Sequence, residues 1–109
     1  MGMKITVPVA KVLAALLTEP DGEHYGLHLM HQTGLASGTL YPVLARLEQA
    51  GWLSRRWEDL DPAAAGRPAR RYYQLTAEGA TQAHTVLAEL RASTTVPATK
   101  TSAQARPAW

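Results

Sequence analysis

The stretch Ser37-Gly-Thr-Leu-Tyr-Pro-Val-Leu-Ala-Arg-Leu-Glu-Gln-Ala-Gly51 decides the fold of this chain. Wound as a helix at about 100° per residue, it places on one stripe the apolar residues Leu40, Val43, Leu44 and Leu47. The opposite side is small and flat and carries one cation and two hydrogen-bonding side chains: Thr39, Pro42, Ala45, Arg46 and Gln49. A strongly charged face would suit water, whereas this face suits close approach to another surface. The sequence therefore predicts a helix over residues 38–50 that inserts into a groove, most simply a groove of DNA.

Both ends of this helix carry recognisable signals. Ser37 is expected to be its N-cap, and Gly51 lies where a left-handed glycine ends a helix. Pro42 removes the hydrogen bond to the carbonyl of Gly38. The resulting bend could re-aim the first helical turn, or it could be a kink without a role.

The composition bounds the remaining possibilities. With 109 residues, 46% of them hydrophobic and no Phe, the chain supports one small domain whose core is mostly Leu, Val and Ala. The absence of Cys excludes a disulfide framework, thiolate chemistry and a Cys-based zinc site. No apolar run is long enough for a membrane span, and no signal peptide is visible. A soluble, cytoplasmic protein without a membrane partner is the expectation.

Two helices are expected before the central one. The first should begin near Pro8, because apolar residues then recur at helical spacing: Val9, Val12, Leu13, Leu16 and Leu17. After a turn at residues 19–22, a second helix is expected from His24 to Thr33, with Gly26 allowing another helix to approach closely. The short turn over residues 34–37 then gives a helix-turn-helix arrangement.

Three histidines fall on the outer side of the expected second helix, namely His24, His28 and His31. Imidazoles at this spacing could converge on a metal ion. However, no carboxylate or Cys nearby completes a ligand set, so a solvated polar face is the preferred interpretation. We expect no metal and no cofactor.

The residues after Gly51 predict a long-looped hairpin. Residues 52–57 and 69–75 alternate in the manner of strands, and a loop at residues 58–68 joins them. The outgoing arm is acidic, whereas the returning arm carries three arginines: Arg67, Arg70 and Arg71. A hairpin after a helix-turn-helix is a wing, although an ordinary solvated hairpin is the alternative. Trp52, Trp57 and Tyr72 are expected to form the core beneath it.

A last helix is expected over residues 76–92, with Thr76 as its cap and Glu78 in its first turn. Its apolar positions form a narrow seam of the kind seen in coiled coils: Ala80, Ala83, Leu87 and Leu90. The helix could instead fold back on its own domain, but self-association is favoured. Residues 93–109, rich in Ser, Thr, Pro and Ala, are expected to be a mobile tail. The predicted organisation is thus a mainly α fold with a small β-hairpin, comprising a winged helix-turn-helix at residues 1–75 and a dimerisation helix.

Three blocks in this order resemble the PadR family of winged-helix transcription regulators. They are Tyr25-Gly-Leu-His-Leu-Met, the stretch from Ser37 to Leu53, and Gly66-Arg-Pro-Ala-Arg-Arg-Tyr-Tyr-Gln-Leu-Thr-Ala-Glu-Gly79. The resemblance covers roughly residues 9–90 and is similar to the short subfamily with one C-terminal helix. It implies a homodimer on a palindromic operator, mostly acting as a repressor and in several members released by a small aromatic or drug-like molecule. The acidic, Ala-rich loop at residues 58–65 and the scarcity of aromatics at the seam depart from the family pattern.

The DNA contacts follow from side-chain chemistry. Near the start of the central helix, Ser37, Thr39 and Tyr41 are expected to donate hydrogen bonds to phosphates, and Tyr25 to do the same from the second helix. Base edges are the expected targets of Arg46 and Gln49, because Arg to guanine is the commonest specific pairing. The remaining expected contacts are Pro42 in the helix and Arg67 and Arg70 on the wing, whereas strand alternation leaves Arg71 and Tyr73 unassigned.

Two other classes of function are compatible with parts of the sequence. A winged helix could serve as a protein-interaction module without binding DNA, because fold alone does not fix function. An enzyme is disfavoured, since no nucleophile elbow, phosphate-cradling glycine loop or metal signature accompanies the Ser, His and Asp residues.

Overall fold

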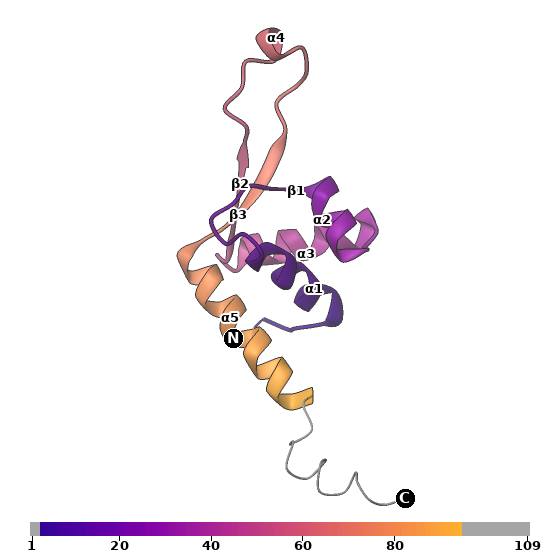
Figure 1. Cartoon of the computed structure of the whole chain (residues 1–109), viewed down its shortest axis with the longest axis vertical. Helices are drawn as coiled ribbons and strands as arrows, with labels where there is room; N and C mark the ends of the chain where they lie inside the picture. The colour runs from indigo at the N-terminus through magenta and orange to yellow at the C-terminus, as the bar shows by residue number, and fades with distance from the viewer. Residues whose placement is uncertain (1–2, 95–109) are drawn as a thin grey trace, which may run out of the picture.

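The computed structural model describes residues 3–94 as a helical body from which a β-hairpin projects (Figure 1). The elements in chain order are α1 (Val7–Leu17), β1 (His24–Tyr25), α2 (Gly26–Thr33), α3 (Ser37–Gln49), β2 (Leu53–Trp57), α4 (Pro62–Ala65), β3 (Arg71–Leu75) and α5 (Ala77–Thr94). The strands form one antiparallel sheet in the order β1-β3-β2. This is the winged helix-turn-helix architecture that the sequence predicts.

Helix α1 lies at the centre of the body. It begins beside Pro8, and the Thr6 hydroxyl accepts a hydrogen bond from the Val9 amide at 3.3 Å. Its inward face joins the stripe of α3 in one core of Leu and Val side chains, which includes Val12, Leu13, Leu16, Leu40, Val43, Leu44 and Leu47. The periodicity that predicts both helices is confirmed.

The turn between α2 and α3 is held by local hydrogen bonds. Gly34 has a φ of 74°, and the buried Thr33 hydroxyl donates to the Leu29 carbonyl at 2.7 Å and accepts from the Leu35 amide at 3.2 Å. The N-cap of α3 is Ala36, not Ser37, which is instead the first helical residue. Ala36 offers no side-chain acceptor, so this helix end is left uncapped by any side chain.

Gly51 ends α3 as expected, with a φ of 82°. The Gly51 amide donates to the Glu48 carbonyl and the Trp52 amide to the Leu47 carbonyl, each at 3.0 Å. These two bonds form a Schellman motif, which reverses the chain directly into β2.

The expected second helix begins two residues later than the sequence indicates. His24 and Tyr25 form strand β1 instead, because they pair with Tyr73 and Tyr72 at the edge of the sheet. His24 is buried, with its Nε2 2.9 Å from the Glu19 carbonyl oxygen. The three histidines therefore do not share one helix face, and between residues 3 and 94 no three His, Cys, Asp or Glu side chains are grouped as metal ligands.

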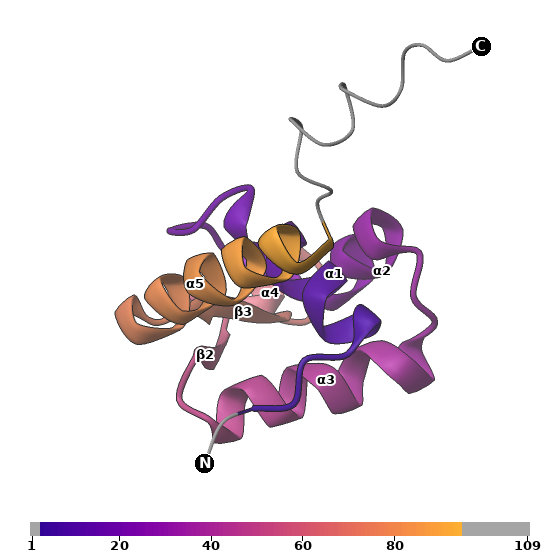
Figure 2. The same ribbon diagram turned by 90° about the horizontal axis from the view of Figure 1, so that it is seen from below.

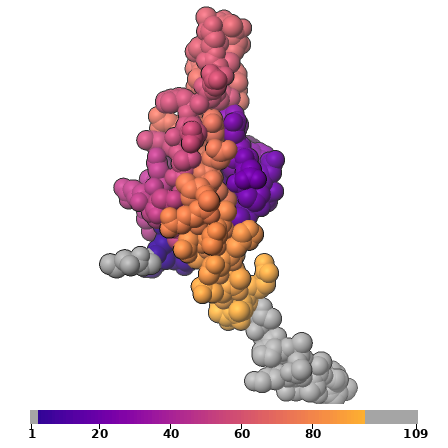
Figure 3. Space-filling view, turned by 90° about the vertical axis from the view of Figure 1, so that its left-hand side faces the viewer, coloured from indigo at the N-terminus to yellow at the C-terminus, as the bar shows by residue number. Residues whose placement is uncertain are grey.

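The wing contains regular structure along its arms and at its tip. Strands β2 and β3 pair from Leu53↔Leu75 to Trp57↔Arg71, and the Glu58 amide extends the ladder by donating to the Arg70 carbonyl at 2.8 Å. At the tip, where a loop is expected, the short helix α4 is capped by Asp61 and ended by Gly66 at a φ of 71°. Figure 3 shows the wing as a narrow arm projecting from the body.

The aromatic residues beneath the wing differ from expectation in two positions. Trp52 is buried as predicted, but Trp57 is 60% exposed, and the guanidinium of Arg71 lies 4.5 Å from its ring centroid. Trp57 lies at the outer end of β2, away from the buried Leu53 at its start, and Arg71 covers part of its ring. Tyr72 is half-buried on the opposite face of the sheet, whereas Tyr73 is buried.

Helix α5 runs along α1 on the far side of the core from α3 (Figure 2). Thr76 caps it, since its hydroxyl accepts from the Gly79 amide at 2.9 Å and donates to the Gly51 carbonyl at 2.7 Å. Ala83 is fully buried in the core of its own domain, which corrects its assignment to a dimer seam. Ser93 and Thr94 continue the helix rather than beginning a tail, and the rest of the expected tail lies outside the described residues. No helix between residues 3 and 94 has the length and apolar character needed to cross a bilayer.

Candidate nucleic-acid interface

The outward side of α3 forms an exposed ridge. Leu40, Val43, Leu44 and Leu47 are fully or almost fully buried, and this fixes the rotation of the helix. The five residues predicted on the opposite side are all exposed, and so is Ser37 in the first turn: Ser37, Thr39, Pro42, Ala45, Arg46 and Gln49. We call these six residues the α3 ridge. The side chains of Arg46 and Gln49 make no hydrogen bond or ion pair with any other described residue, so their polar groups face solvent.

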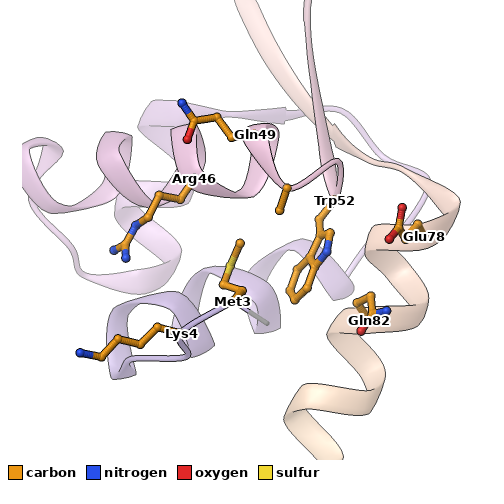
Figure 4. A pocket seen from close by; sticks show the side chains of 8 residues that line it. Met3, Lys4, Arg46, Gln49, Trp52, Glu78 and Gln82 are labelled. Carbon is orange, nitrogen blue, oxygen red and sulfur yellow. The ribbon is translucent and has the colours of Figure 1, made fainter. Parts of the chain in front are cut away.

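Two clefts flank the α3 ridge. The first, which we call the arm cleft, has a volume of about 540 Å³ and separates α3 from the N-terminal segment and α5. Its lining comprises Met3, Lys4, Arg46, Gln49, Ala50, Trp52, Glu78 and Gln82. The side chains of Met3 and Trp52 point into it, whereas Lys4 and Arg46 extend outward at the same end (Figure 4). Lys4 thus adds a second cation beside Arg46.

The second cleft, which we call the wing cleft, separates α3 from the two strands of the wing and has a volume of about 420 Å³. Its lining comprises Gly26, Tyr41, Ala45, Glu48, Arg55, Arg71 and Tyr73. The α3 ridge and the base of the wing therefore face a common space on one side of the molecule.

Gly26 allows α3 to pack closely against the start of α2. A Cβ at this position would collide with the Tyr41 hydroxyl and ring, so the aromatic side chain lies directly against the backbone at the start of α2. The close approach predicted for Gly26 is thereby confirmed, with a tyrosine of α3 as the approaching group. Tyr41 itself is 43% exposed, which leaves part of its side chain open to a partner.

Two wing arginines reach the side of the wing that faces α3. Arg55 pairs with Tyr73 and Arg71 with Trp57, and because alternate strand residues share a face, these four lie on the face that begins with the buried Leu53. The sequence analysis missed Arg55 and left Arg71 unassigned. The signal was present in the alternation outward from Leu53, but only the register between the strands shows which arginines face α3.

Arg67 and Tyr25, both expected to contact DNA, are instead held by Glu58. Arg67 Nη1 lies 2.8 Å from Glu58 Oε1, and the Tyr25 hydroxyl donates to Glu58 Oε2 at 3.0 Å. The Arg70 amide donates to the same carboxylate at 2.8 Å, and the Arg70 side chain is exposed. The hydrogen bond from Arg67, followed by that from the Arg70 amide, lowers the pKa of Glu58 to about 2.

The family comparison agrees with this geometry. The model of the transcriptional regulator PadR-like family matches residues 12–85, which include the helix-turn-helix, the wing and half of α5. The family is one of transcriptional regulators, not of enzymes. No curated protein matches the chain.

Three solved structures illustrate the similarity in fold. The circadian clock associated protein Pex from Anabaena is 27% identical with a TM-score of 0.60, over 80% of this chain and 76% of that one. A PadR-like transcription factor from Bacteroides fragilis is 29% identical with a TM-score of 0.52, over 75% and 77%. The PcaV transcriptional regulator from Streptomyces coelicolor, in complex with its natural ligand, is 26% identical with a TM-score of 0.64, over 84% of this chain and 59% of that one.

Proposed function

Because the chain belongs to the PadR-like family of transcriptional regulators, we propose that it represses transcription as a homodimer bound to a palindromic operator. DNA binding itself follows from the family. The observation that carries the proposal is the α3 ridge, a row of small side chains around an unpartnered Arg46 and Gln49, with cationic clefts on either side.

In this proposal α3 enters the major groove. Arg46 reads guanine, because its guanidinium donates to the N7 and O6 acceptors, and Gln49 reads adenine, because its amide donates to N7 and accepts from the N6 amino group. Pro42 and Ala45 are small enough to bring the helix axis close to the bases. Ser37 and Thr39 lie in the first turn of α3, where their hydroxyls and the uncapped amides face a phosphate together.

The wing contacts the DNA backbone next to the groove. The Arg70 side chain is exposed and has no ion pair among residues 3–94, so it contacts phosphate directly. Arg67 acts through its ion pair with Glu58, which ties the two arms of the wing together. Tyr25 anchors the same carboxylate from β1 and thereby orients the wing relative to the body.

An apolar surface supports the dimer. Ile5, Val7, Ala10, Ala14 and Leu90 line a cleft of about 310 Å³ between α1 and the end of α5. Val7 is 69% exposed and Leu90 41% exposed, which is unusual for large apolar side chains grouped at one place. A second copy packed on this surface would cover both. Leu87 and Ala80 pack against their own core and contribute only their outer edges.

The twofold symmetry of the dimer then determines the spacing of the operator half-sites. Two helix-turn-helix units related by a twofold axis read half-sites about one helical turn, roughly 34–36 Å, apart. A dimer also has twice as many cations for phosphate contacts, which strengthens the salt-dependent affinity for DNA. A single domain of formal net charge +2 would bind DNA only weakly.

Release by a small aromatic ligand completes the proposal. The arm cleft contains an indole and a thioether next to Arg46 and Gln49, so a planar molecule seated there would obstruct the side chains that read bases. The PcaV structure contains a natural ligand, which supports a ligand-responsive regulator of this fold.

The experiment is a fluorescence anisotropy titration of the full chain with duplexes from the DNA upstream of its own gene. We expect one duplex to bind at least about 10³-fold more tightly than a scrambled duplex of equal length, with a steep decrease in affinity as salt rises. Equal, salt-insensitive binding of all duplexes, or none, would favour the alternative of a protein-interaction module.

A further inference from the structure

The Tyr73 side chain is buried, and its hydroxyl has no hydrogen-bond partner among the described residues. The residue is 6% exposed, and its hydroxyl makes no hydrogen bond to any residue between 3 and 94. Buried hydroxyls in native proteins nearly always have a hydrogen-bond partner, so an unpaired one requires an explanation.

The unpaired hydroxyl faces the wing cleft. The charged and polar side chains whose fields act on it are those of Tyr41, Arg55, Arg71 and Glu48, and all four line this cleft together with Tyr73. Burial, the largest effect, raises the pKa of Tyr73. The hydroxyl therefore stays protonated at neutral pH and is available as a donor.

The cleft favours an anion. Arg55 lies 3.5 Å from Glu48, which offsets its charge, whereas Arg71 has no carboxylate partner within residues 3–94 and lies over the Trp57 ring instead. Two arginines against one glutamate leave a net charge of +1. Helix α2 begins at Gly26 in the lining without a side-chain cap, which adds the positive end of its dipole.

We propose that the wing cleft is an oxyanion site that receives one phosphate of a nucleic-acid backbone, with the Tyr73 hydroxyl as hydrogen-bond donor and Arg71 as the counter-charge. The source of the phosphate rests on the proposed DNA-binding function. A free phosphate ion has the same chemistry, so both sources are tested. The bound phosphate pairs the buried hydroxyl and fixes the wing relative to α3.

The decisive variant is Tyr73→Phe, which keeps the buried ring and removes only the donor. Its matched control is Tyr72→Phe, because Tyr72 lies on the opposite face of β3, with its ring centroid 6.2 Å from that of Tyr25. We expect Tyr73→Phe to weaken binding of operator and unrelated duplex alike by about fivefold to tenfold, with the melting temperature of the free protein unchanged or raised. Wild-type affinity in Tyr73→Phe, or an equal loss in Tyr72→Phe, would overturn the site.

The role of Arg71 is tested with a second variant and its matched control. Arg71→Gln should reduce the slope of log K against log salt by about 0.9, the value for one lost phosphate contact. Arg56→Gln, on the opposite face of β2, should leave the slope nearly unchanged. An equal reduction in both variants would mean that only overall charge matters and that the cleft is not a site.

A second arm uses inorganic phosphate alone. The melting temperature is measured in phosphate and in chloride at equal ionic strength, and we expect phosphate to stabilise the wild type more than Tyr73→Phe. If the wild type binds no duplex, the proposed function fails, while this arm still decides the site. If phosphate acts through Tyr73 but duplex affinity does not depend on Tyr73, the site takes a free anion and the backbone assignment is overturned. If neither arm depends on Tyr73, there is no site.

Discussion

Arg67 and Glu58 form a two-bond ion pair between the arms of the wing, with Nη1–Oε1 at 2.8 Å and Nη2–Oε2 at 3.3 Å. Sequence order alone places Arg67 among the cations that contact DNA. The pairing changes its role, because a guanidinium that already satisfies a carboxylate contributes little net charge to a passing phosphate. On the face of the wing that is turned toward α3, the arginines are instead Arg55 and Arg71.

Replacing both members of this pair tests that change of role. The variant Arg67→Gln with Glu58→Gln removes one positive and one negative charge, so the slope of log K against log salt should change by less than about 0.3. A direct phosphate contact by Arg67 would instead lower the slope by about 0.9. The measurement is a salt titration of duplex binding, with the wild type and Arg70→Gln compared in parallel.

Glu58 also makes stability depend on pH in a defined window. Its folded pKa is about 2, below the ordinary value of 4.5, so its contribution is complete above about pH 4.5 and is lost as the pH falls toward 2. The melting temperature of the wild type should exceed that of Glu58→Gln above pH 5. The difference should shrink on acidification, because protonated Glu and Gln then resemble each other. A difference that grows below pH 4 would contradict the ion pair.

Arg46 should determine sequence preference rather than affinity for DNA in general. Replacing it by Ala should cost about 1–3 kcal/mol on duplexes that carry its preferred base and much less on duplexes that lack it. Competition binding with single-base operator variants measures this. Arg56→Ala serves as the control, since it is an exposed wing arginine on the face away from α3. Equal losses on every duplex would assign Arg46 to the backbone.

Gly79 joins α5 to the base of the wing. A Cβ at Gly79 would collide with the backbone of Trp52, which cannot move without disturbing both β2 and the Thr76 cap. Gly79→Ala should therefore lower the free energy of unfolding by about 1–3 kcal/mol or more. Gly38→Ala, whose Cβ would meet no neighbour, should raise it by about 0.5 kcal/mol. Chemical denaturation of both variants checks the contrast.

The proposed dimer is tested at Leu90. Leu87 is a less suitable position for this test, because it packs on its own core and a charge there would unfold the domain. Leu90→Glu should shift the sedimentation equilibrium from dimer to monomer and weaken operator binding. Lys11→Gln, at the edge of the same cleft, lowers the net charge by the same amount and controls for charge alone. An unchanged molecular mass in Leu90→Glu would place the dimer interface elsewhere.

The sequence predicted those parts of the fold that depend on periodicity and local signals. The buried stripe from Leu40 to Leu47, the exposed ridge opposite it and the Gly51 ending all follow from spacing within one segment. Strand β1 could not be foreseen, because His24 and Tyr25 are strand residues only through pairing with Tyr73 and Tyr72, nearly fifty positions away. The local propensity of residues 24 and 25 gives no information about a pairing partner so distant in the sequence.

The candidate site was predictable to the same extent. Arg46 and Gln49 belong to the helix whose pattern is clearest, so their exposure followed from the sequence. Arg55 and Arg71 depend on the register of two strands, and the Glu58–Arg67 pair depends on how the two arms meet. The loss of Ala83 from the dimer seam has the same origin, since α5 packs along α1 and buries the residue that a seam would expose.

The central claim is that the α3 ridge and the adjoining face of the wing form one DNA-binding surface. The most direct measurement is a titration of ¹⁵N-labelled protein with an upstream duplex, followed by backbone amide chemical shifts. We expect the largest changes on residues 37–49 and on Arg55, Arg71 and Tyr73, with little change at Arg56. Changes confined to α1 and α5, with the amides of Thr39 and Arg46 unmoved, would contradict it.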